Sequence, residues 1–143
     1  MSNELMIADA RRRHVDAKAK RLETVGSVIP VDWDRAVEAA WPTIWGAYRC
    51  GLPGGWVDLV LAFSEHLAEI APLVWVEDSK EKYGGMRVDL TGDLTEEAQA
   101  LAEVYESLSE HVCQDCGEPG RLREDRAWYA TLCDRHAVVR EPT

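Results

Sequence analysis

Residues 113–136 read CQDCGEPGRLREDRAWYATLCDRH, and this stretch decides the fold of the C-terminal part of the chain. It contains two pairs of possible metal ligands, and the members of each pair are separated by two residues. Three thiolates and one imidazole at this spacing suit tetrahedral Zn²⁺, and a site with four protein ligands is closed to substrate. The stretch therefore predicts one structural zinc ion, with the ligands Cys113, Cys116, Cys133 and His136.

The residues between the two pairs predict the local structure. Gly117 permits a tight turn after Cys116 because glycine tolerates positive φ, and the composition of residues 120–131 is typical of a short hairpin. Cys133 and His136 lie one turn apart at the start of a predicted short helix. Such a knuckle, hairpin and helix describe a treble-clef or zinc-ribbon module. Disulfide bonds are the competing interpretation, but they are rare in the cytoplasm and do not explain this spacing.

The segment before the zinc ligands is predicted to be a helix, Leu94–Val112. Asp93 followed by Glu96 forms a capping-box pattern at its start, and apolar residues recur at every third or fourth position. This apolar stripe packs on the rest of the chain or forms a dimer seam, so we expect a monomer or a dimer through Leu94–Val112. The other faces carry carboxylates and no basic residue, among them Glu103, Glu106 and Glu110.

Residues 73–82 and 86–91 are predicted to be the two strands of a hairpin. Apolar and polar residues alternate over 86–91, which gives this strand one apolar face, and the dipeptide Gly84-Gly85 suits a two-residue turn. With this turn the expected neighbours are Tyr83 opposite Met86 and Lys80 opposite Asp89, with Trp75 on the apolar face.

Three cations of this hairpin stand out in an acidic region: Lys80, Lys82 and Arg87. Lysine on an exposed edge strand discourages pairing between sheets, so edge protection is one interpretation. The other interpretation is a surface that binds a partner or an anion. The sequence leaves both open.

The N-terminal half is predicted to be helical. Residues 4–24 form a basic helix, which we interpret as solvated and partly frayed, although such helices also contact nucleic acid or acidic partners. Asp32 is the expected N-cap of a helix over residues 33–41, which ends there because Pro42 follows. An amphipathic helix covers residues 56–70.

These elements predict an α+β fold, in which helices pack on a small antiparallel hairpin. The hairpin and the acidic helix belong to one core, and the zinc ligands hold a small unit that follows it. We expect three segments: a basic N-terminal helix and linker (1–30), an acidic α+β core (31–112) and the zinc-binding module (113–143).

Composition and charge limit the classes of function. The chain has a formal net charge of −10, whereas non-specific binding of nucleic acid needs a basic footprint. No apolar run approaches the roughly 20 residues of a membrane helix, and the N-terminus lacks the pattern of a secretory signal. We therefore expect a cytoplasmic protein without a membrane partner.

The remaining cysteine and histidines have ordinary interpretations. Cys50 is expected to be a small buried hydrophobe, with an accessory ligand or a reactive thiol as the alternative. His111 could substitute as a ligand, but His136 completes the better spacing. His14 and His66 lie on predicted helices without a visible partner, and we expect them to be exposed.

Familiar catalytic motifs do not occur in this sequence. It has no phosphate-binding glycine loop, no serine-hydrolase elbow and no His-x-Glu motif of the kind that zinc deaminases use. A nuclease of the His-Asn-His type needs a histidine on the hairpin, whereas no histidine lies between Cys116 and Cys133. We therefore expect a protein that is not an enzyme.

Several stretches together resemble a known family: Arg49-Cys50-Gly51 with Gly55-Trp56, KEKYGGMR at 80–87, CQDCGEPGRLR at 113–123 and TLCDRH at 131–136. In this order they resemble small, largely uncharacterised proteins of bacteriophages, prophages and their bacterial hosts. Tyr83 and Met86 stand where Phe and Leu are more typical of that family. The family supplies no established activity, so the resemblance implies only a setting, that of a mobile-element accessory protein. Such proteins often bind and redirect a host macromolecule.

The expected function is a non-enzymatic, zinc-stabilised module that binds a host protein or ribonucleoprotein complex, for example as an anti-CRISPR-like, anti-defence inhibitor. The candidate partner-binding residues are Glu103, Glu106 and Glu110 on the acidic helix, with Lys80, Lys82 and Arg87 on the hairpin. The alternative is a nucleic-acid-binding zinc-ribbon regulator. Its candidate residues are Arg11–Arg13, Lys18, Lys20, Arg21, Arg121, Arg123 and Arg126.

Overall fold

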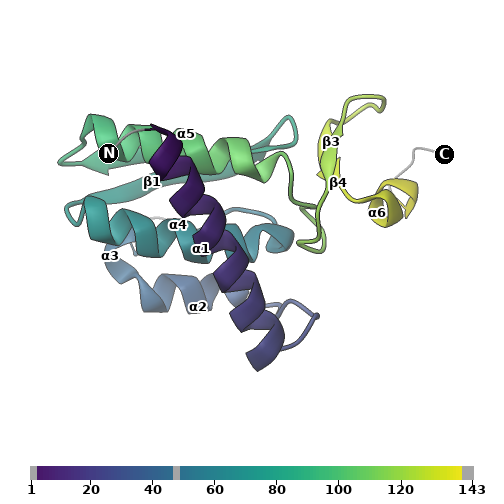
Figure 1. Cartoon of the computed structure of the whole chain (residues 1–143), viewed down its shortest axis with the longest axis horizontal. Coiled ribbons are helices and arrows are strands. Elements are labelled where there is room, and N and C mark those ends of the chain that lie inside the picture. The colour runs from purple at the N-terminus through teal and green to yellow at the C-terminus, as the bar shows by residue number, and fades with distance from the viewer. Residues whose placement is uncertain (1–2, 47–48, 140–143) are drawn as a thin grey trace.

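The computed structural model describes residues 3–46 and 49–139, and its elements form an α+β fold (Figure 1). Helices α1 to α5 and the hairpin β1–β2 make up the body, and the hairpin β3–β4 with α6 lies to one side of it. The predicted α+β class is confirmed. The elements in chain order are α1 (Asn3–Thr24), α2 (Trp33–Ala40), α3 (Pro42–Trp45), the 3₁₀ turn η1 (Gly54–Trp56), α4 (Val57–Ile70), β1 (Val74–Lys82), β2 (Gly85–Gly92), α5 (Glu96–Ser109), β3 (Arg121–Arg123), β4 (Ala130–Leu132) and α6 (Asp134–Val139).

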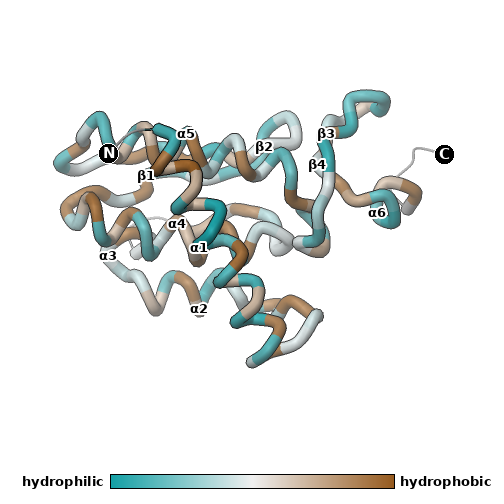
Figure 2. The backbone as a smooth tube through the Cα atoms, in the orientation of Figure 1, coloured by the Kyte–Doolittle hydropathy of each residue, from teal (hydrophilic) through white to brown (hydrophobic). Residues whose placement is uncertain are grey.

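Helix α4 lies at the centre of the body and most of its residues are buried, with hydrophobic residues interspersed with a few hydrophilic ones along the helix (Figure 2). Leu59, Phe63 and Leu67 are fully buried. The helix contacts α1 and α5, which also contact each other, and the ring of Phe63 packs edge-to-face against Tyr105 of α5. The helix predicted for residues 56–70 is thus confirmed, with its first turn wound as η1.

Helix α1 is confirmed over its predicted range, and one of its faces is buried although most of its residues are exposed. Met6 and Ala10 are buried in the main core, and the Arg13 guanidinium pairs with the carboxylates of Glu65 and Glu69 on α4. The expectation of a solvated terminal helix is corrected in one respect, because a face of α1 is docked on the body. The short apolar stripe of α1 is sufficient to hold the helix on the body because Arg13 also forms ion pairs with acidic residues of α4.

His66 is buried, which contradicts the prediction that it is exposed. Only 1% of its surface is accessible. Its Nδ1 lies 3.1 Å from the Tyr105 hydroxyl, and its Nε2 lies 3.5 Å from the Asp9 carboxylate. Three helices, α1, α4 and α5, therefore meet at this imidazole. His14 is half-buried on α1 rather than exposed.

The buried imidazole predicts a pH dependence of stability. Burial, assisted by the positive charge of Arg13, lowers the pKa of His66 below its ordinary value of 6.5. The folded state therefore favours the neutral ring, and the contribution of His66 is complete above pH 6.5 and is lost as the pH falls through that value. We expect the free energy of unfolding to fall between pH 7 and pH 5, by no more than about 1.4 kcal/mol per pH unit for this one group.

Chemical denaturation of the wild type and of His66→Gln at several pH values checks this prediction. The variant should show a shallower slope over the same pH range. Equal slopes in the wild type and His66→Gln would contradict the prediction.

The predicted hairpin is confirmed, but its register is corrected. The two-residue turn is Tyr83-Gly84 rather than Gly84-Gly85, and both of its residues have positive φ (55° and 83°), as a type I′ turn requires. Lys80 consequently pairs with Arg87 and not with Asp89. Tyr83 points away from the apolar face and is exposed.

Trp75 does not lie on the apolar face, which corrects a second prediction. A β-bulge interrupts the pairing between Val76 and Asp78, and one extra residue reverses which side chains of the preceding segment face inward. Val74 and Val76 are therefore buried, and Trp75 between them is half-buried on the opposite face.

Helix α5 begins later than predicted, and its N-cap is Thr95 rather than Asp93. The Thr95 hydroxyl accepts a hydrogen bond of 3.0 Å from the amide of Ala98. Asp93 is too early because β2 continues to Gly92, which turns the chain with a φ of +100°. Leu101 and the other buried residues of the predicted stripe pack against β2 and α4, which favours packing within the chain over a dimer seam.

Helix α5 also covers the outer edge of β2. The Ser109 hydroxyl accepts a hydrogen bond from the Met86 amide, and the Glu106 carboxylate accepts one from the Val88 amide, each 2.9 Å long. These amides belong to an edge strand and would otherwise need water or another strand. Glu106 is therefore part of the fold as well as of the acidic surface.

Candidate metal centre

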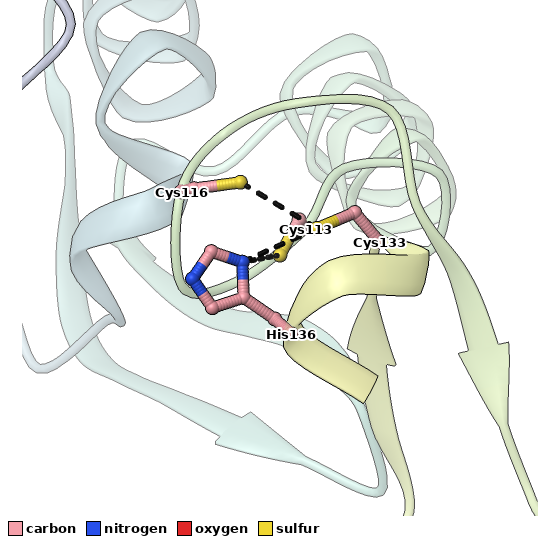
Figure 3. Close-up of side chains that lie close together, drawn as sticks. All are labelled: Cys113, Cys116, Cys133 and His136. Carbon is pink, nitrogen blue, oxygen red and sulfur yellow. Dashed lines mark hydrogen bonds between the residues drawn. The ribbon is translucent and has the colours of Figure 1, made fainter. Parts of the chain in front are cut away.

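The four predicted ligands come together at the C-terminal end of the molecule (Figure 3). Their ligand atoms all lie within 4.8 Å of one another. The Sγ atoms of Cys116 and Cys133 are 3.8 Å apart, and His136 Nδ1 lies 3.7 Å from Cys113 Sγ and 3.2 Å from Cys133 Sγ. Cys113 is buried and the other three are half-buried. This arrangement is consistent with a metal site.

A tight knuckle supplies the first two ligands. Val112 forms an isolated antiparallel bridge with Pro119, and the Cys113 amide donates to the Glu118 carbonyl over 2.8 Å. Gly117 turns the chain back with a φ of +81°, as the sequence predicted. The bridge and the turn hold both sulfur atoms on the inside of the loop (Figure 3).

The hairpin β3–β4 and α6 supply the other two ligands. Arg121 pairs with Leu132 and Arg123 with Ala130, which confirms the hairpin predicted for residues 120–131. The chain then passes through Cys133 directly into α6, where the Ala137 amide donates to the Cys133 carbonyl. The predicted helix at the second ligand pair is confirmed. The last four residues of the predicted module, 140–143, lie outside the described residues.

Two arginines of this hairpin hold the module together. The buried guanidinium of Arg123 donates to the Leu132 carbonyl and, over 2.9 Å, to the Asp134 carboxylate. Arg126 donates to the Ala137 carbonyl over 3.3 Å. The sequence had suggested both for nucleic-acid binding, yet the Arg123 guanidinium bonds within the module, and Arg126 is turned inward, with its Nε and Nη1 buried without a hydrogen-bond partner. Arg121 is exposed.

The thiol pKa values differ within the cluster. Burial raises the pKa of Cys116 to about 11, and the neighbouring Cys113 adds to the increase. Burial acts in the same direction on Cys133, but hydrogen bonds from the His136 backbone and ring outweigh it and lower the pKa of Cys133 to about 6. Thiolate is the form that binds a metal, and a bound cation stabilises it further.

Other possible ligands lie outside the cluster. Cys50 is buried in the main core, as predicted, and burial raises the pKa of its thiol to about 12. His111 is exposed and does not belong to the group of four. Among residues 3–46 and 49–139, Cys113, Cys116, Cys133 and His136 are the one group of this kind.

The knuckle is anchored to the body by residues at the start of α4. The Trp56 indole N–H donates to the Val112 carbonyl, and the Gly55 amide donates to the Gln114 carbonyl, each over 2.9 Å. A second anchor is the Thr131 hydroxyl, which donates to the Gly84 carbonyl over 2.6 Å. The Gly-Trp pair and the glycine turn of KEKYGGMR, which carried the family resemblance, therefore both contact the metal module.

The predicted partner-binding residues lie on the body. Glu103 is exposed on α5, whereas Glu106 and Glu110 are half-buried. Lys80 and Lys82 are exposed on the β1–β2 hairpin. Arg87 is half-buried beside them and donates to the Met86 carbonyl.

Comparison with known proteins finds no protein-family model, no curated protein and no solved structure that matches this chain. The predicted membership of a phage protein family therefore stays a prediction. None of the helices in the described part of the chain is long and apolar enough to cross a membrane.

Proposed function

We propose that this chain is a non-enzymatic, zinc-stabilised protein-interaction module. The observation that carries the proposal is the group of three thiols and one imidazole, which lies at the junction of a knuckle, a hairpin and a helix. Four protein donors complete a tetrahedral site and leave no position for substrate, so the metal is structural. The order of the elements supports a treble-clef-like arrangement.

The donor distances support zinc as the metal. A tetrahedral site with Zn–S bonds of about 2.3 Å places two sulfur atoms about 3.8 Å apart. The Sγ atoms of Cys116 and Cys133 lie 3.8 Å apart. A thiolate-rich set also disfavours the hard cations Mg²⁺ and Ca²⁺, which prefer oxygen ligands.

The placement of the cations favours a protein partner over nucleic acid. Arg13 pairs with two α4 carboxylates, Arg21 is buried against Asp58, and Arg123 is buried in the metal module. Arg21 and Arg123 cannot neutralise phosphates without leaving their buried positions, and Arg13 would have to give up its two carboxylate partners. The net charge of −10 further opposes binding to nucleic acid.

The proposed partner is a host protein or ribonucleoprotein complex, and an anti-defence inhibitor of a mobile element is the form that the family resemblance suggests. The proposed contact surface combines Glu103, which is exposed in the middle of α5, and the half-buried Glu110 at the C-cap of that helix with Lys80 and Lys82 on the hairpin. Glu106 serves less well because its carboxylate caps the Val88 amide.

Charge reversal at two positions tests this function. The double variant Glu103→Lys/Glu110→Lys is expected to weaken capture of the protein partner about tenfold and to reduce its salt sensitivity, because complementary charge across an interface is removed. Glu106 is left intact so that the edge of β2 stays capped. Partner capture from the native host, scored for protein and for nucleic acid at two salt concentrations, gives the measurement.

The same experiment discriminates the alternative regulator. If the wild type binds DNA or RNA tightly in a salt-dependent gel-shift titration, and charge reversal strengthens that binding, the chain is a nucleic-acid-binding protein. Arg121→Ala is the matching variant for that case, because Arg121 is exposed whereas Arg123 is structural.

A further inference from the structure

The α1 helix reaches the metal knuckle through a second set of contacts, which the sequence did not reveal. Arg21, near the C-terminal end of α1, is 6% exposed and lies against Asp58 in the first turn of α4. Its Nε and Nη2 donate to the two oxygens of Asp58 over 2.7 and 3.0 Å. Its Nη1 donates to the Gly26 carbonyl over 3.2 Å. The guanidinium is thus held in a fixed orientation by a bidentate pair.

This ion pair lies directly against the knuckle. A Cβ atom added at Gly117 would lie 3.6 Å from Arg21 Nη2 and 3.7 Å from Asp58 Oδ2. One turn earlier on the same face of α1, Lys18 Nζ lies 3.0 Å from the Glu118 carboxylate. Two residues of α1 therefore contact the two residues that directly follow Cys116.

We propose that Arg21 is a positioning residue of the metal centre, and that docking of the C-terminal half of α1 and metal binding stabilise each other. The inference rests on the proposed zinc centre. The knuckle holds Cys113 and Cys116, and apart from the isolated Val112–Pro119 bridge it lies outside the helices and strands, so contacts from the body help to fix it. Residues behind the ligands determine how well a site is preorganised, and coupling between two binding events is reciprocal.

The fold offers a matched control within the same helix. Arg13 also joins α1 to α4, through Glu65 and Glu69. It lies more than two turns before Arg21, and its partners are at the far end of α4 from Asp58. Arg13→Gln and Arg21→Gln therefore both remove an ion pair between α1 and α4, but only Arg21 faces the knuckle.

Zinc affinity, measured by competition with a chelator of known affinity, provides the test. Arg21→Gln is expected to weaken zinc binding roughly tenfold, the lower end of the range for outer-shell partners of a ligand, because Arg21 lies against the knuckle and not against a ligand atom. Arg13→Gln is expected to change it by about twofold or less, and the surface variant Lys18→Gln by an intermediate factor. Equal affinity in the wild type, Arg21→Gln and Lys18→Gln would overturn the proposal.

A second measurement on the wild type keeps the proposal testable if Arg21→Gln does not fold. Amide hydrogen exchange is compared with zinc bound and after removal by the chelator. Residues 14–24 should lose protection when zinc is removed, whereas residues 5–13 should keep most of theirs. Unchanged protection in 14–24 would overturn the coupling. If the wild type binds no zinc, the proposed function itself fails, and the coupling fails with it.

Discussion

Cys116→Ser is expected to abolish stoichiometric zinc binding and to unfold the metal module while the body stays folded. The structure explains why the two parts should respond differently. The body has a continuous core formed by α1 to α5 and the β1–β2 hairpin, whereas the buried core of the module consists of Cys113, Ala130, Leu132 and Ala137. So small a core cannot stabilise a fold without a metal or another cross-link.

The magnitude follows from the role of metal in such modules. Structural zinc contributes on the order of 10 kcal/mol of apparent binding free energy to folding, and loss of one of four ligands removes a large part of it. The body should keep its tertiary structure, with some loss of stability because Trp56 and Gly55 donate hydrogen bonds to the knuckle. Amide exchange should show the largest loss of protection in residues 113–139, and a smaller loss in residues 14–24, the part of α1 that docks on the knuckle.

Elemental analysis and a matched cysteine variant check this prediction. The wild type should contain one zinc per chain, Cys116→Ser much less than one, and Cys50→Ser the same as the wild type, because Cys50 lies in the main core. A purified wild type without metal, or one with a disulfide between Cys113 and Cys133, would refute the metal centre.

The metal site could be predicted from the sequence because its information is local. Both ligand pairs use a spacing of two residues, and the connecting segment is short enough to form a hairpin. Gly117 marks the turn of the knuckle, and its φ of +81° agrees with that interpretation. The same locality explains why α4 and the presence of the β1–β2 hairpin were predicted correctly.

The register of the hairpin was predicted wrongly for a physical reason. Lys80 was expected opposite Asp89 and lies opposite Arg87, two residues away. A shift of two residues keeps every side chain near the turn on the same face of the sheet, so the apolar pattern cannot distinguish the two pairings. Two possible turns, Tyr83-Gly84 and Gly84-Gly85, share a glycine. The structure uses Tyr83-Gly84, so Gly84 is the second residue of the turn. The Glu81 carboxylate accepts a hydrogen bond from the Gly84 amide over 2.7 Å.

Two further errors concern partners far apart in the sequence. His66 looked unpartnered because Asp9 and Tyr105 belong to other helices. Arg21 looked like one cation of a basic helix, yet it pairs with Asp58 at the knuckle. Composition and periodicity report the environment along one element, whereas a buried polar contact depends on how the elements pack.

Gly55→Ala is expected to be among the most destabilising single substitutions outside the metal ligands. Gly55 lies where the start of α4 meets the knuckle, and its amide donates to the Gln114 carbonyl. A Cβ atom there would lie 2.2 Å from the Cys113 carbonyl oxygen and 2.4 Å from the Gln114 carbonyl carbon. These are backbone atoms beside a ligand, so the clash can be relieved only by moving the knuckle away from the body.

We expect Gly55→Ala to lower the free energy of unfolding by about 3 kcal/mol, which combines overpacking with a lost hydrogen bond. Zinc binding should weaken as well, because the displaced knuckle carries Cys113. Gly54→Ala is the matched control: its Cβ would meet the side chain of Trp33 at 3.3 Å, and a side chain can shift by a few tenths of an ångström. Denaturation and zinc competition on both variants give the measurement. If the two alanines have equal effects, the contact at Gly55 does not hold the metal module on the body.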